Sequence, residues 1–484
     1  MRRARLVLAA AFALAGAAHA APVRLGVVVV VDQMRADYLV RSDSPDGGFR
    51  RLRREGAVFS QARHLHLPTE TGPGHAAIST GRSPAVHGIV ANDWYDRVAA
   101  TDTYCVADSV YGIGPEHLRG PTLADAFKAS EPGARVFSVS GKDRAAVILG
   151  GRKADVALWV DRKTGGFTTS SYYRRPAWLD AFNASLAKSG LLPVEGGRLK
   201  KGVAASPAYD LALEKLVDEL LAREKVGRGP GRDLLLISWS GTDYVGHRYG
   251  TQAPEMDAQL ASLDAILGRV LTRLTKAAGG DLALALSADH GAIPSPEDPA
   301  GIALGVRRLD WDAFEASLEA RLQKEWPAPG RRWVVSAQLP HLYLDRAAAE
   351  ARGLEWRAFL RRAAAVLSGA DGVAGAFVSG ETGGAFDAQL KRSYDPSRTG
   401  DLFVVMAEKV LLHDSPNGTS HGSPWDYDAR VPLVFWGRGV RPGVVDAPAA
   451  TVDLAPTLGR LIGLDYPPGE DGKVRAEALA EAAR

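Results

Sequence analysis

The chain contains apolar runs that end at acidic side chains, and helix-like segments separate these runs along the sequence. Val23–Val31 is rich in valine, and Asp32 follows it directly. Asp243 and Asp289 come shortly after two later runs of the same kind. Such runs are typical of strands buried on both faces of a parallel sheet, and ligands collect at the carboxyl edge of these sheets. The sequence therefore predicts an α/β fold with a functional site at one edge of its sheet.

Apolar residues recur at helical spacing between these runs, in Tyr209–Lys225 and in Met256–Lys276. Strands that alternate with helices predict a doubly wound, mostly parallel sheet flanked by helices. The runs expected to form buried parallel strands are Val23–Val31, Arg135–Val139, Asp233–Trp239, Asp281–Ser287 and Val431–Trp436.

The length of 484 residues, with 46% hydrophobic and 24% charged residues, is typical of a large globular protein. We expect a catalytic core with inserted cap regions, because two segments carry no ligand candidates. The expected parts are a core over 21–304 and 401–484, an insertion near 151–205 and an inserted cap over 305–400. Within the cap, the patterns predict helices over Leu309–Trp326 and Ala348–Leu367 and a strand pair around Trp333–Leu344.

Residues 1–20 have a basic start, a short apolar run and an Ala-His-Ala end, which predicts a secretory signal peptide cleaved after Ala20. Its apolar run of roughly 14 residues falls short of the ~20 that a membrane anchor needs. A periplasmic or secreted monomer without a membrane anchor is expected. Three of the 59 basic residues are arginines of this leader, so the remaining 56 equal the 56 acidic residues in number. Because this leaves no net positive charge, no nucleic-acid binding is expected. Cys105 is the single cysteine, which excludes an intrachain disulfide.

One candidate metal set joins a helical pair to a distant histidine. Asp243 and His247 are four residues apart, so both side chains can face one ion from a helix. His421, in Gly-Thr-Ser-His-Gly, would complete this set. Taken alone, an Asp-x-x-x-His pair often serves as a helix cap or a surface hydrogen-bonding pair.

A second candidate set lies at strand ends. Asp289 and His290 are adjacent where a run ends, and with Asp32 they would hold a second ion. A mixture of imidazole and carboxylate ligands favours zinc over magnesium or calcium. We therefore expect two Zn²⁺ ions per chain, in a site suited to hydrolysis of a phosphate ester.

Thr71 is the candidate nucleophile and would also face both ions as a ligand. It lies in Thr-Glu-Thr-Gly-Pro-Gly-His-Ala, a Gly/Pro turn before the helix-like Ala76–Thr80. A hydroxyl at a helix start lies beside free backbone N–H groups that bind phosphoryl oxygens, and zinc would ionise it near neutral pH. The alternative is that Thr71 only caps the helix, and Thr69 is the nearest rival nucleophile. Four nearby histidines are expected to be structural: His64, His66, His75 and His87.

Three further residues are candidates for binding phosphate. Lys142 and Arg144 follow a predicted strand, and in extended geometry their side chains would point the same way. Paired cations suit the dianion of a phosphate monoester, and Arg can bind two of its oxygens. Asn92 could donate to another phosphoryl oxygen. An exposed charged turn and an ordinary Asn turn are the structural alternatives.

The combined pattern resembles the alkaline phosphatase superfamily, and within it the phosphate-irrepressible, PafA-like bacterial phosphatases with a Thr nucleophile. The resemblance runs from about Val23 to Leu461 and is carried by VVVVVDQMRADYL, TETGPGHAAISTG, HGIVANDWYD, SGKDRAA, SWSGTDYVGHRYG, SADHGA and TSHGSPWDYDARVPLVFWG. It implies the superfamily's fold, two zinc ions and a covalent phospho-Thr intermediate. It matches Thr71 to the nucleophile and Asn92, Lys142 and Arg144 to phosphate binding. It matches one zinc to Asp243, His247 and His421, and the other to Asp32, Asp289 and His290.

The expected function is that of a zinc-dependent phosphate monoester hydrolase of broad specificity, acting on small-molecule esters. One alternative is a phosphodiesterase, nucleotide pyrophosphatase or phosphonate hydrolase on the same metals. The related nucleotide pyrophosphatases typically lack the Lys-x-Arg pair and carry Phe-Pro-Asn-His where this chain has Gly72-Pro73-Gly74-His75. Sulfatases need a Cys or Ser converted to formylglycine, and Cys105 is not in that context. The non-enzyme alternative is a secreted zinc-binding protein, which would need no Thr beside its metals.

Overall fold

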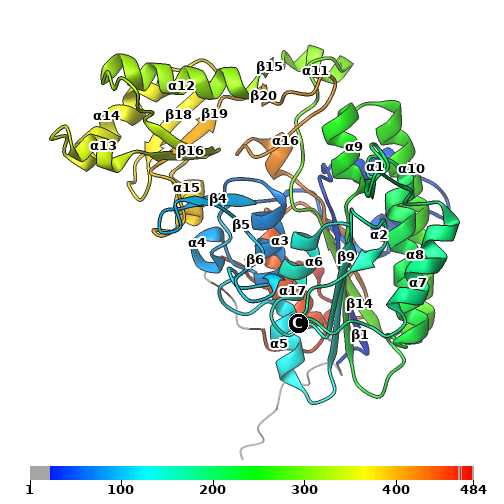
Figure 1. Ribbon diagram of the computed structural model, residues 1–484. Coiled ribbons are helices and arrows are strands. Elements are labelled where there is room, and N and C mark those ends of the chain that lie inside the picture. The colour runs from blue at the N-terminus through cyan, green and yellow to red at the C-terminus, as the bar shows by residue number, and fades with distance from the viewer. Residues whose placement is uncertain (1–21, 467–468, 470, 482–484) are drawn as a thin grey trace, which may run out of the picture.

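A mixed sheet with helices on both faces forms the larger part of the molecule, and a second, smaller sheet forms a cap beside it (Figure 1). This computed structural model describes residues 22–466, 469 and 471–481, so the expected signal peptide lies outside the described residues. The order of the nine-stranded sheet is β10-β9-β8-β13-β1-β14-β21-β2-β22. Its strands are β1 (Leu25–Val31), β2 (Ala57–Phe59), β8 (Arg135–Ser140), β9 (Val156–Val160), β10 (Phe167–Thr168), β13 (Asp233–Trp239), β14 (Leu282–Ser287), β21 (Leu433–Gly437) and β22 (Gly443–Val445).

The centre of the sheet is parallel, as the sequence predicts. β9, β8, β13, β1 and β14 pair in parallel in that order. The expectation for Val431–Trp436 is wrong in direction, because β21 pairs antiparallel with both β14 and β2. A strand covered by helices on both faces is apolar throughout in either direction, so its composition does not reveal how it pairs.

β1 shows why its sequence is an unbroken apolar run. Val27, Val29 and Val31 pack into the hydrophobic core on one face of the sheet, and Val28 and Val30 pack into the core on the other. All five are at most 2% exposed. Because side chains alternate between the two faces of a strand, both faces must be apolar when helices cover both.

The helices on the first face include α2 (Gly48–Glu55), α8 (Pro207–Arg223) and α10 (Pro254–Ala278), whose apolar residues join the core there. α8 and α10 confirm the predicted helices Tyr209–Lys225 and Met256–Lys276 to within two residues at each end. On the other face, the core receives side chains of α3 (Thr71–Thr80), α5 (Leu123–Ser130) and α17 (Leu454–Leu461).

The cap is built on a four-stranded antiparallel sheet in the order β16-β17-β19-β18. It has a hydrophobic core of its own that includes Leu318, Trp333 and Phe359. The strands β15 (Arg307–Leu309) and β20 (Val410–Leu412) pair where the chain enters and leaves the cap (Figure 1). The cap elements are α12 (Trp311–Glu325), β16 (Val334–Gln338), β17 (His341–Leu344), α13 (Arg346–Glu350), α14 (Trp356–Ser368), β18 (Val373–Val378), α15 (Asp387–Ser393) and β19 (Leu402–Met406).

Two cap expectations need correction. The helix expected over Ala348–Leu367 is two helices, α13 and α14, because Gly353 adopts a left-handed backbone with φ of 70° between them. The cap sheet also includes β19, which lies beyond residue 400, where the expected cap ends. The helix and strand-pair predictions over Leu309–Trp326 and Trp333–Leu344 are confirmed by α12 and by β16 with β17.

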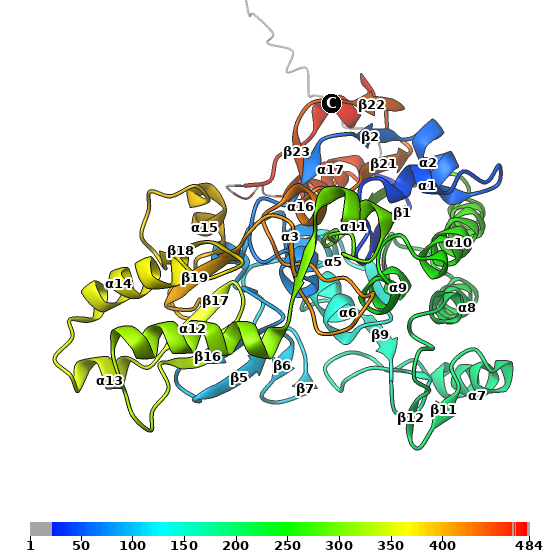
Figure 2. The same ribbon diagram turned by 90° about the horizontal axis from the view of Figure 1, so that it is seen from above.

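The range 151–205 is only partly an insertion. β9, inside this range, continues the parallel part of the central sheet, and β10 closes that edge. The following elements are α7 (Leu179–Ser189), β11 (Val194–Glu195) and β12 (Arg198–Leu199), and α7 lies beside α8 (Figure 2). Just after β12, Gly202 lies against α9 (Gly241–Tyr249), because a Cβ at this glycine would be 2.4 Å from Nη1 of Arg248. This segment therefore borders the helix that carries Asp243 and His247.

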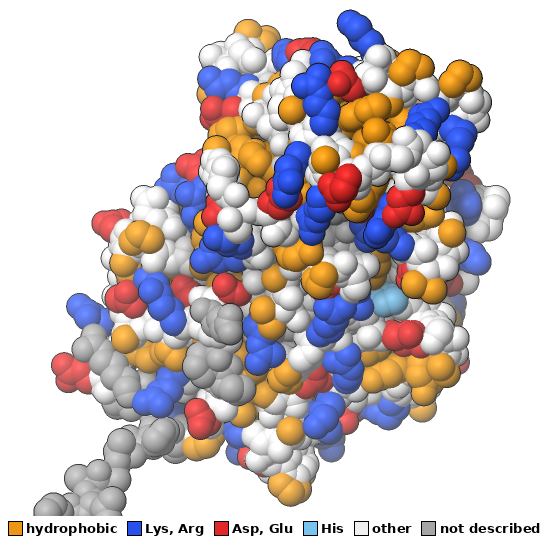
Figure 3. Space-filling view, turned by 90° about the vertical axis from the view of Figure 1, so that its left-hand side faces the viewer, with side chains coloured by type: hydrophobic (Ala, Val, Ile, Leu, Met, Phe, Trp, Pro, Cys, Tyr) orange, Lys and Arg blue, Asp and Glu red, His pale blue; other side chains and the backbone are white. Residues whose placement is uncertain are grey.

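Basic and acidic side chains are interspersed over both the cap and the core on the face seen in Figure 3. Among the described residues, no helix has the length and apolar character that spanning a bilayer demands.

Candidate active site

Four neighbouring parallel strands deliver the candidate site residues to one edge of the sheet. Asp32 follows β1 directly, and Asp289 comes two residues after β14. Lys142 comes two residues after β8, and Asp243 lies in the first turn of α9, which follows β13. Because β8, β13, β1 and β14 are adjacent and parallel, their carboxyl ends meet. The fold thus brings together residues that are far apart in the sequence.

Asp32, Asp289 and His290 form a compact cluster in which all three side chains are fully buried. Nε2 of His290 lies 3.5 Å from Oδ1 of Asp32 and 3.6 Å from Oδ2 of Asp289. Burial and the neighbouring Asp289 raise the pKa of Asp32 well above its usual range. A cation held between the two carboxylates would offset the cost of burying both charges.

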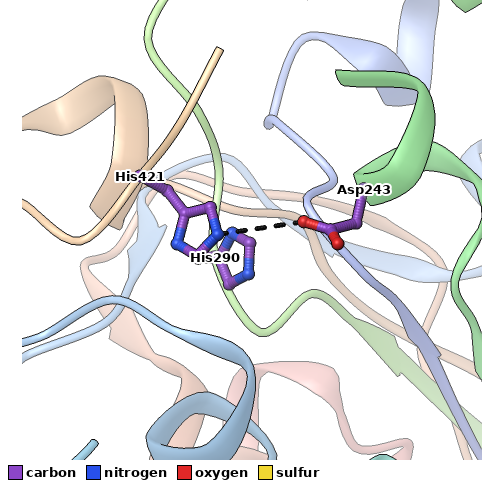
Figure 4. A group of neighbouring side chains, drawn as sticks. All are labelled: Asp243, His290 and His421. Carbon is purple, nitrogen blue, oxygen red and sulfur yellow. Dashed lines mark ion pairs between the residues drawn. The ribbon is translucent and has the colours of Figure 1, made fainter. Parts of the chain in front are cut away.

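A second cluster surrounds Asp243. Its Oδ1 lies 3.1 Å from Nε2 of His247 on the next turn of α9, as their spacing predicts, and 3.8 Å from Nε2 of His421. Figure 4 shows His421 and His290 facing Asp243, and the two imidazole rings stack with centroids 3.5 Å apart. His290 is within reach of both clusters. Although burial would raise the pKa of Asp243, His247 and Lys142 hold it well below its usual range.

Backbone carbonyls fix the orientation of the three histidines. In each ring Nδ1 lies 2.8–2.9 Å from a carbonyl oxygen, which can only accept, so Nδ1 carries the hydrogen. Nε2 is then the unprotonated nitrogen and points toward the carboxylates, the arrangement that metal-binding histidines use. The pairs are His247 with Thr419, His290 with Gly291, and His421 with Thr69.

These residues fit a pair of divalent cations. Oδ2 of Asp32 is ion-paired with Nζ of Lys142 at 2.6 Å, but Oδ1 of Asp32, Oδ2 of Asp289 and Nε2 of His290 are buried without a hydrogen-bond partner. Leaving buried charged atoms unpaired is costly, and a cation coordinated by them removes that cost. The donor set of three carboxylates and three imidazoles matches the preference of zinc.

Thr71 lies at the start of α3, with Glu70 as the preceding cap residue. The helix therefore begins five residues earlier than Ala76–Thr80, because Pro73 sits in the first turn, where no N–H is needed. A Cβ at Gly74 would lie 2.2 Å from the carbonyl oxygen of Asp289, so only glycine at this position permits the close approach of α3 to the end of β14. The Gly-Pro-Gly sequence thus places Thr71 beside the carboxylates.

The side chains of Lys142 and Arg144 both contact the Thr71 hydroxyl. Nζ of Lys142 donates to Thr71 Oγ1 at 3.4 Å, and Nη2 of Arg144 donates to the same oxygen at 3.3 Å. Thr71 is the first residue of α3 and not its N-cap residue, which is Glu70. The rival Thr69 instead donates its hydroxyl hydrogen to the carbonyl of Ser423 at 2.9 Å. Of the two threonines, Thr71 is the one whose oxygen faces the cationic groups.

The geometric reason expected for this convergence is wrong. Lys142 is the extended residue that precedes α6 (Asp143–Gly150), and Arg144 lies in the first turn of that helix. The two side chains therefore leave different kinds of backbone and meet at Thr71 because α6 packs against α3. Nζ of Lys142 also lies 2.6 Å from Oδ2 of both Asp32 and Asp243, between the two clusters.

Asn92 is held beside Thr71 by two hydrogen bonds. Its Oδ1 accepts from the backbone N–H of Gly72 at 2.7 Å, and its own N–H donates to Glu70 at 2.8 Å. The amide nitrogen Nδ2 is then the group left to donate to a ligand. Burial raises the pKa of Glu70 to about 7.

The structure adds residues that sequence reasoning missed. Gln33 donates from its backbone to Asp289 at 3.0 Å and from its side chain to Asp243 at 2.9 Å, so it ties the two clusters together. Tyr104 accepts from Arg144 at 3.4 Å. The position of Gln33, directly after Asp32, was the available signal for it; nothing in the sequence around Tyr104 points to Arg144.

The four histidines expected to be structural are all buried. His75 contacts the backbone oxygen of Thr71 at 2.8 Å and Oδ2 of Asp289 at 3.3 Å, so it supports the site from behind. His64 bonds to the carbonyl of Ala288. His87 accepts from the backbone N–H of Ile89. His66 packs edge-on against the ring of His64.

A cavity of about 180 Å³ lies between the cap and the core, against one face of the site. His421 and Glu70 line it on the core side, and Leu339, Val405 and Leu412 line it on the cap side. The cap therefore forms part of the wall around the candidate ligands.

Comparison with known proteins agrees with this geometry. The chain matches the family described as type I phosphodiesterase / nucleotide pyrophosphatase over residues 26–427. It is 31% identical to the alkaline phosphatase PhoK of a Sphingomonas species, over 94% of this chain and 91% of that protein. It is 29% identical to the alkaline phosphatase PafA of Elizabethkingia meningoseptica, over 94% of each. The crystal structure of PafA matches with a TM-score of 0.86 at 27% identity, covering 95% of this chain and 100% of that one. The chain belongs to the type I phosphodiesterase / nucleotide pyrophosphatase family and is a PafA-like enzyme of the alkaline phosphatase superfamily.

Proposed function

We propose that this enzyme is a zinc-dependent phosphate monoester hydrolase that acts through a covalent phospho-Thr71 intermediate. The observation that carries the proposal is the position of the Thr71 hydroxyl, within 3.4 Å of both Lys142 and Arg144. The two carboxylate–imidazole clusters lie beside it. A nucleophile, two cations and two candidate metal sets are the components that phosphoryl transfer requires.

Asp243, His247 and His421 would hold one zinc ion, and Asp32, Asp289 and His290 the other, with Thr71 as a ligand facing both. When bound, the ions would act as Lewis acids that lower the pKa of a coordinated hydroxyl and stabilise negative charge on phosphoryl and leaving oxygens. The buried, carbonyl-oriented histidines supply the rigid Nε2 donors that such ions need.

The protein residues position the ester for in-line attack. Lys142, Arg144 and Nδ2 of Asn92 would bind the non-bridging oxygens of the phosphoryl group, and Arg144 can contact two of them. In the first turn of α3, the backbone N–H of Gly72 already donates to Asn92 and Pro73 has none, so the side chains supply most of these contacts. These contacts hold phosphorus next to the Thr71 oxygen.

The reaction would then run in two displacements. Thr71 Oγ1 forms a bond to phosphorus as the bond to the ester oxygen breaks; the hydroxyl proton passes to solvent, and the departing oxygen takes a proton as the alcohol leaves. Water then forms a bond to phosphorus and the Oγ1–P bond breaks, which releases phosphate and restores the hydroxyl.

Broad specificity and export complete the proposal. All of the polar contacts named above are to the phosphoryl group, so the alcohol part is free to vary among small-molecule esters. The leader-like sequence of residues 1–20 supports a periplasmic or secreted enzyme.

A phosphodiesterase function is less well supported, because Lys142 and Arg144 both lie at the Thr71 hydroxyl. A diester has a substituent and one fewer negative charge where a monoester has a charged oxygen, so two cations at the nucleophile favour the monoester. The test is kcat/KM of the zinc-loaded protein on phenyl phosphate and on methyl phenyl phosphate. We expect a large preference for phenyl phosphate. A preference for the diester would overturn the monoesterase proposal.

A further inference from the structure

We propose that the alcohol part of the preferred phosphate esters carries a second anionic group, which binds in a basic cavity next to His247. This inference rests on the proposed function and names the substrate class of the same site. The cavity measures about 500 Å³, and most of its lining comes from α9 and from the chain that leads from β9 to α8. Three cations line it: Arg162, Lys201 and Arg248.

The Arg and Lys side chains that line this cavity give it a positive charge. Within the described parts of the chain, no carboxylate lines it, and none forms an ion pair with Arg162, Lys201 or Arg248. Many other arginines of this protein are paired with acids, as Arg269 and Arg273 are with Glu214. Three cations around one hollow produce a positive potential that attracts and holds an anion.

The cavity adjoins the candidate metal site directly. His247 and Tyr244, both on α9, form part of its wall. The ring of Tyr244 lies 5.8 Å from the guanidinium carbon of Arg162 and 5.2 Å from Nζ of Lys142. A substituent on the leaving oxygen that extends past His247 would therefore enter the cavity, while Lys142 stays with the phosphoryl group.

The three cations come from two separate segments that pack against each other. Arg162 and Lys201 belong to the 151–205 segment, which has no role in the phosphoryl chemistry described above, and Arg248 follows His247 on α9. A Cβ at Gly202 would lie 2.4 Å from Nη1 of Arg248, so the turn after Lys201 lies directly against this guanidinium. The segment thus supplies charge to a site whose ligands it does not contain.

The two cavities that border the site differ in chemistry. The cavity beneath the cap includes the carboxyl-bearing residues Glu70 and Asp428 along with apolar side chains, so it suits a neutral group. The cavity at His247 has cations and no acid among the described residues that line it. An anionic leaving group, with a carboxylate or a second phosphate, is therefore directed to the His247 side.

The test compares phenyl phosphate with 4-carboxyphenyl phosphate, which differ by one carboxylate on the leaving group. The quantity measured is the ratio of kcat/KM for the two esters, in the wild type and in the triple variant Arg162→Ala, Lys201→Ala, Arg248→Ala. We expect the ratio to fall about fivefold to tenfold in the triple variant, because three exposed charges that each contribute modestly are removed together. Raising the salt concentration should reduce the wild-type ratio toward that of the variant.

Two controls separate charge from other effects. Lys188→Ala removes an exposed cation of the same segment that does not line the cavity, and it should leave the ratio unchanged. The double variant Arg162→Lys, Arg248→Lys keeps the charges and should keep most of the preference. A ratio that is the same in the triple variant and the wild type would overturn the subsite. A wild-type enzyme that hydrolyses neither ester would instead overturn the proposed monoesterase function.

Discussion

The hydroxyl of Thr71 accepts a hydrogen bond from Nη2 of Arg144 at 3.3 Å, although 73 positions separate the two residues. Nζ of Lys142 donates to the same oxygen at 3.4 Å. Two cations at one hydroxyl stabilise its deprotonated form and also bind the oxygens of a phosphoryl group held there. This contact makes Thr71, and not Thr69, the residue on which activity should depend.

Replacing Thr71 with alanine should abolish turnover of phosphate monoesters, with a loss of at least about 10³-fold in kcat/KM, because no other described hydroxyl contacts both cations. Thr69→Ala is the matched control. The Thr69 hydroxyl bonds to a backbone carbonyl, and its loss should cost less than about tenfold. Wild-type-like turnover by the Thr71 variant would refute the assignment of the nucleophile.

The double variant Lys142→Ala, Arg144→Ala should separate monoesters from diesters. We expect kcat/KM for phenyl phosphate to fall by about 10²-fold or more, since two charge-assisted hydrogen bonds to the dianion are lost. The loss for methyl phenyl phosphate should be at least about tenfold smaller, because the diester carries less charge for these cations to stabilise. Equal losses of kcat/KM on both esters would mean that Lys142 and Arg144 do not distinguish a dianionic from a monoanionic phosphoryl group.

Removal of metal should destabilise the folded protein as well as inactivate it. Asp32 and Asp289 are fully buried, and Oδ2 of Asp289 has no hydrogen-bond donor. A ligand that binds only the native state stabilises it by a few kcal/mol at saturating concentration. For a chain of this length each kcal/mol corresponds to about 1 °C, so chelation should lower Tm by about 3–6 °C. Asp32→Asn should bind zinc more weakly and show a smaller shift. A Tm that is insensitive to chelator and to added zinc would contradict the metal assignment.

The sequence predicts the fold and the meeting of Asp32, Asp243 and Asp289 for one physical reason. Each follows a buried strand, and adjacent parallel strands end at the same edge of a sheet. The pairing of Asp243 with His247 follows in the same way from helical periodicity, since α9 places them one turn apart. Local pattern was sufficient wherever a residue's position depends on a single regular element.

Other features depend on tertiary packing, and the sequence pattern does not contain them. The meeting of Lys142 and Arg144 at Thr71 depends on α6 packing against α3, so the expected extended geometry was wrong. The antiparallel pairing of β21 with β14 and β2 is likewise a tertiary feature that its apolar composition does not report. The side chain of Gln33 reaches Asp243 because β1 and β13 are neighbours, and no residue spacing reports that contact.

Asp210 provides a test of the buried charge near α9 that does not involve catalysis. It is fully buried in α8 and accepts from the N–H of Gly241 at 3.0 Å and from Gln259 at 2.6 Å. Burial raises its pKa from 3.8 to about 6. Between these two pH values the folded state therefore holds a proton that the unfolded state has lost. The stability contributed by Asp210 is present below about pH 4 and decreases as the pH rises to about 6.

Asp210→Asn should remove this dependence while preserving the shape of the side chain. The free energy of unfolding of the variant, relative to the wild type, should increase by about 2 kcal/mol between pH 4 and pH 7, most of the equivalent of the change in pKa. Urea unfolding at a series of pH values, with metal content held constant, measures this difference. Asp257→Asn, at an exposed position on α10, should show no comparable change. If the Asp210 variant instead lost stability relative to the wild type as pH rose, the carboxylate would be stabilised by its donors, and the raised pKa would be wrong in sign.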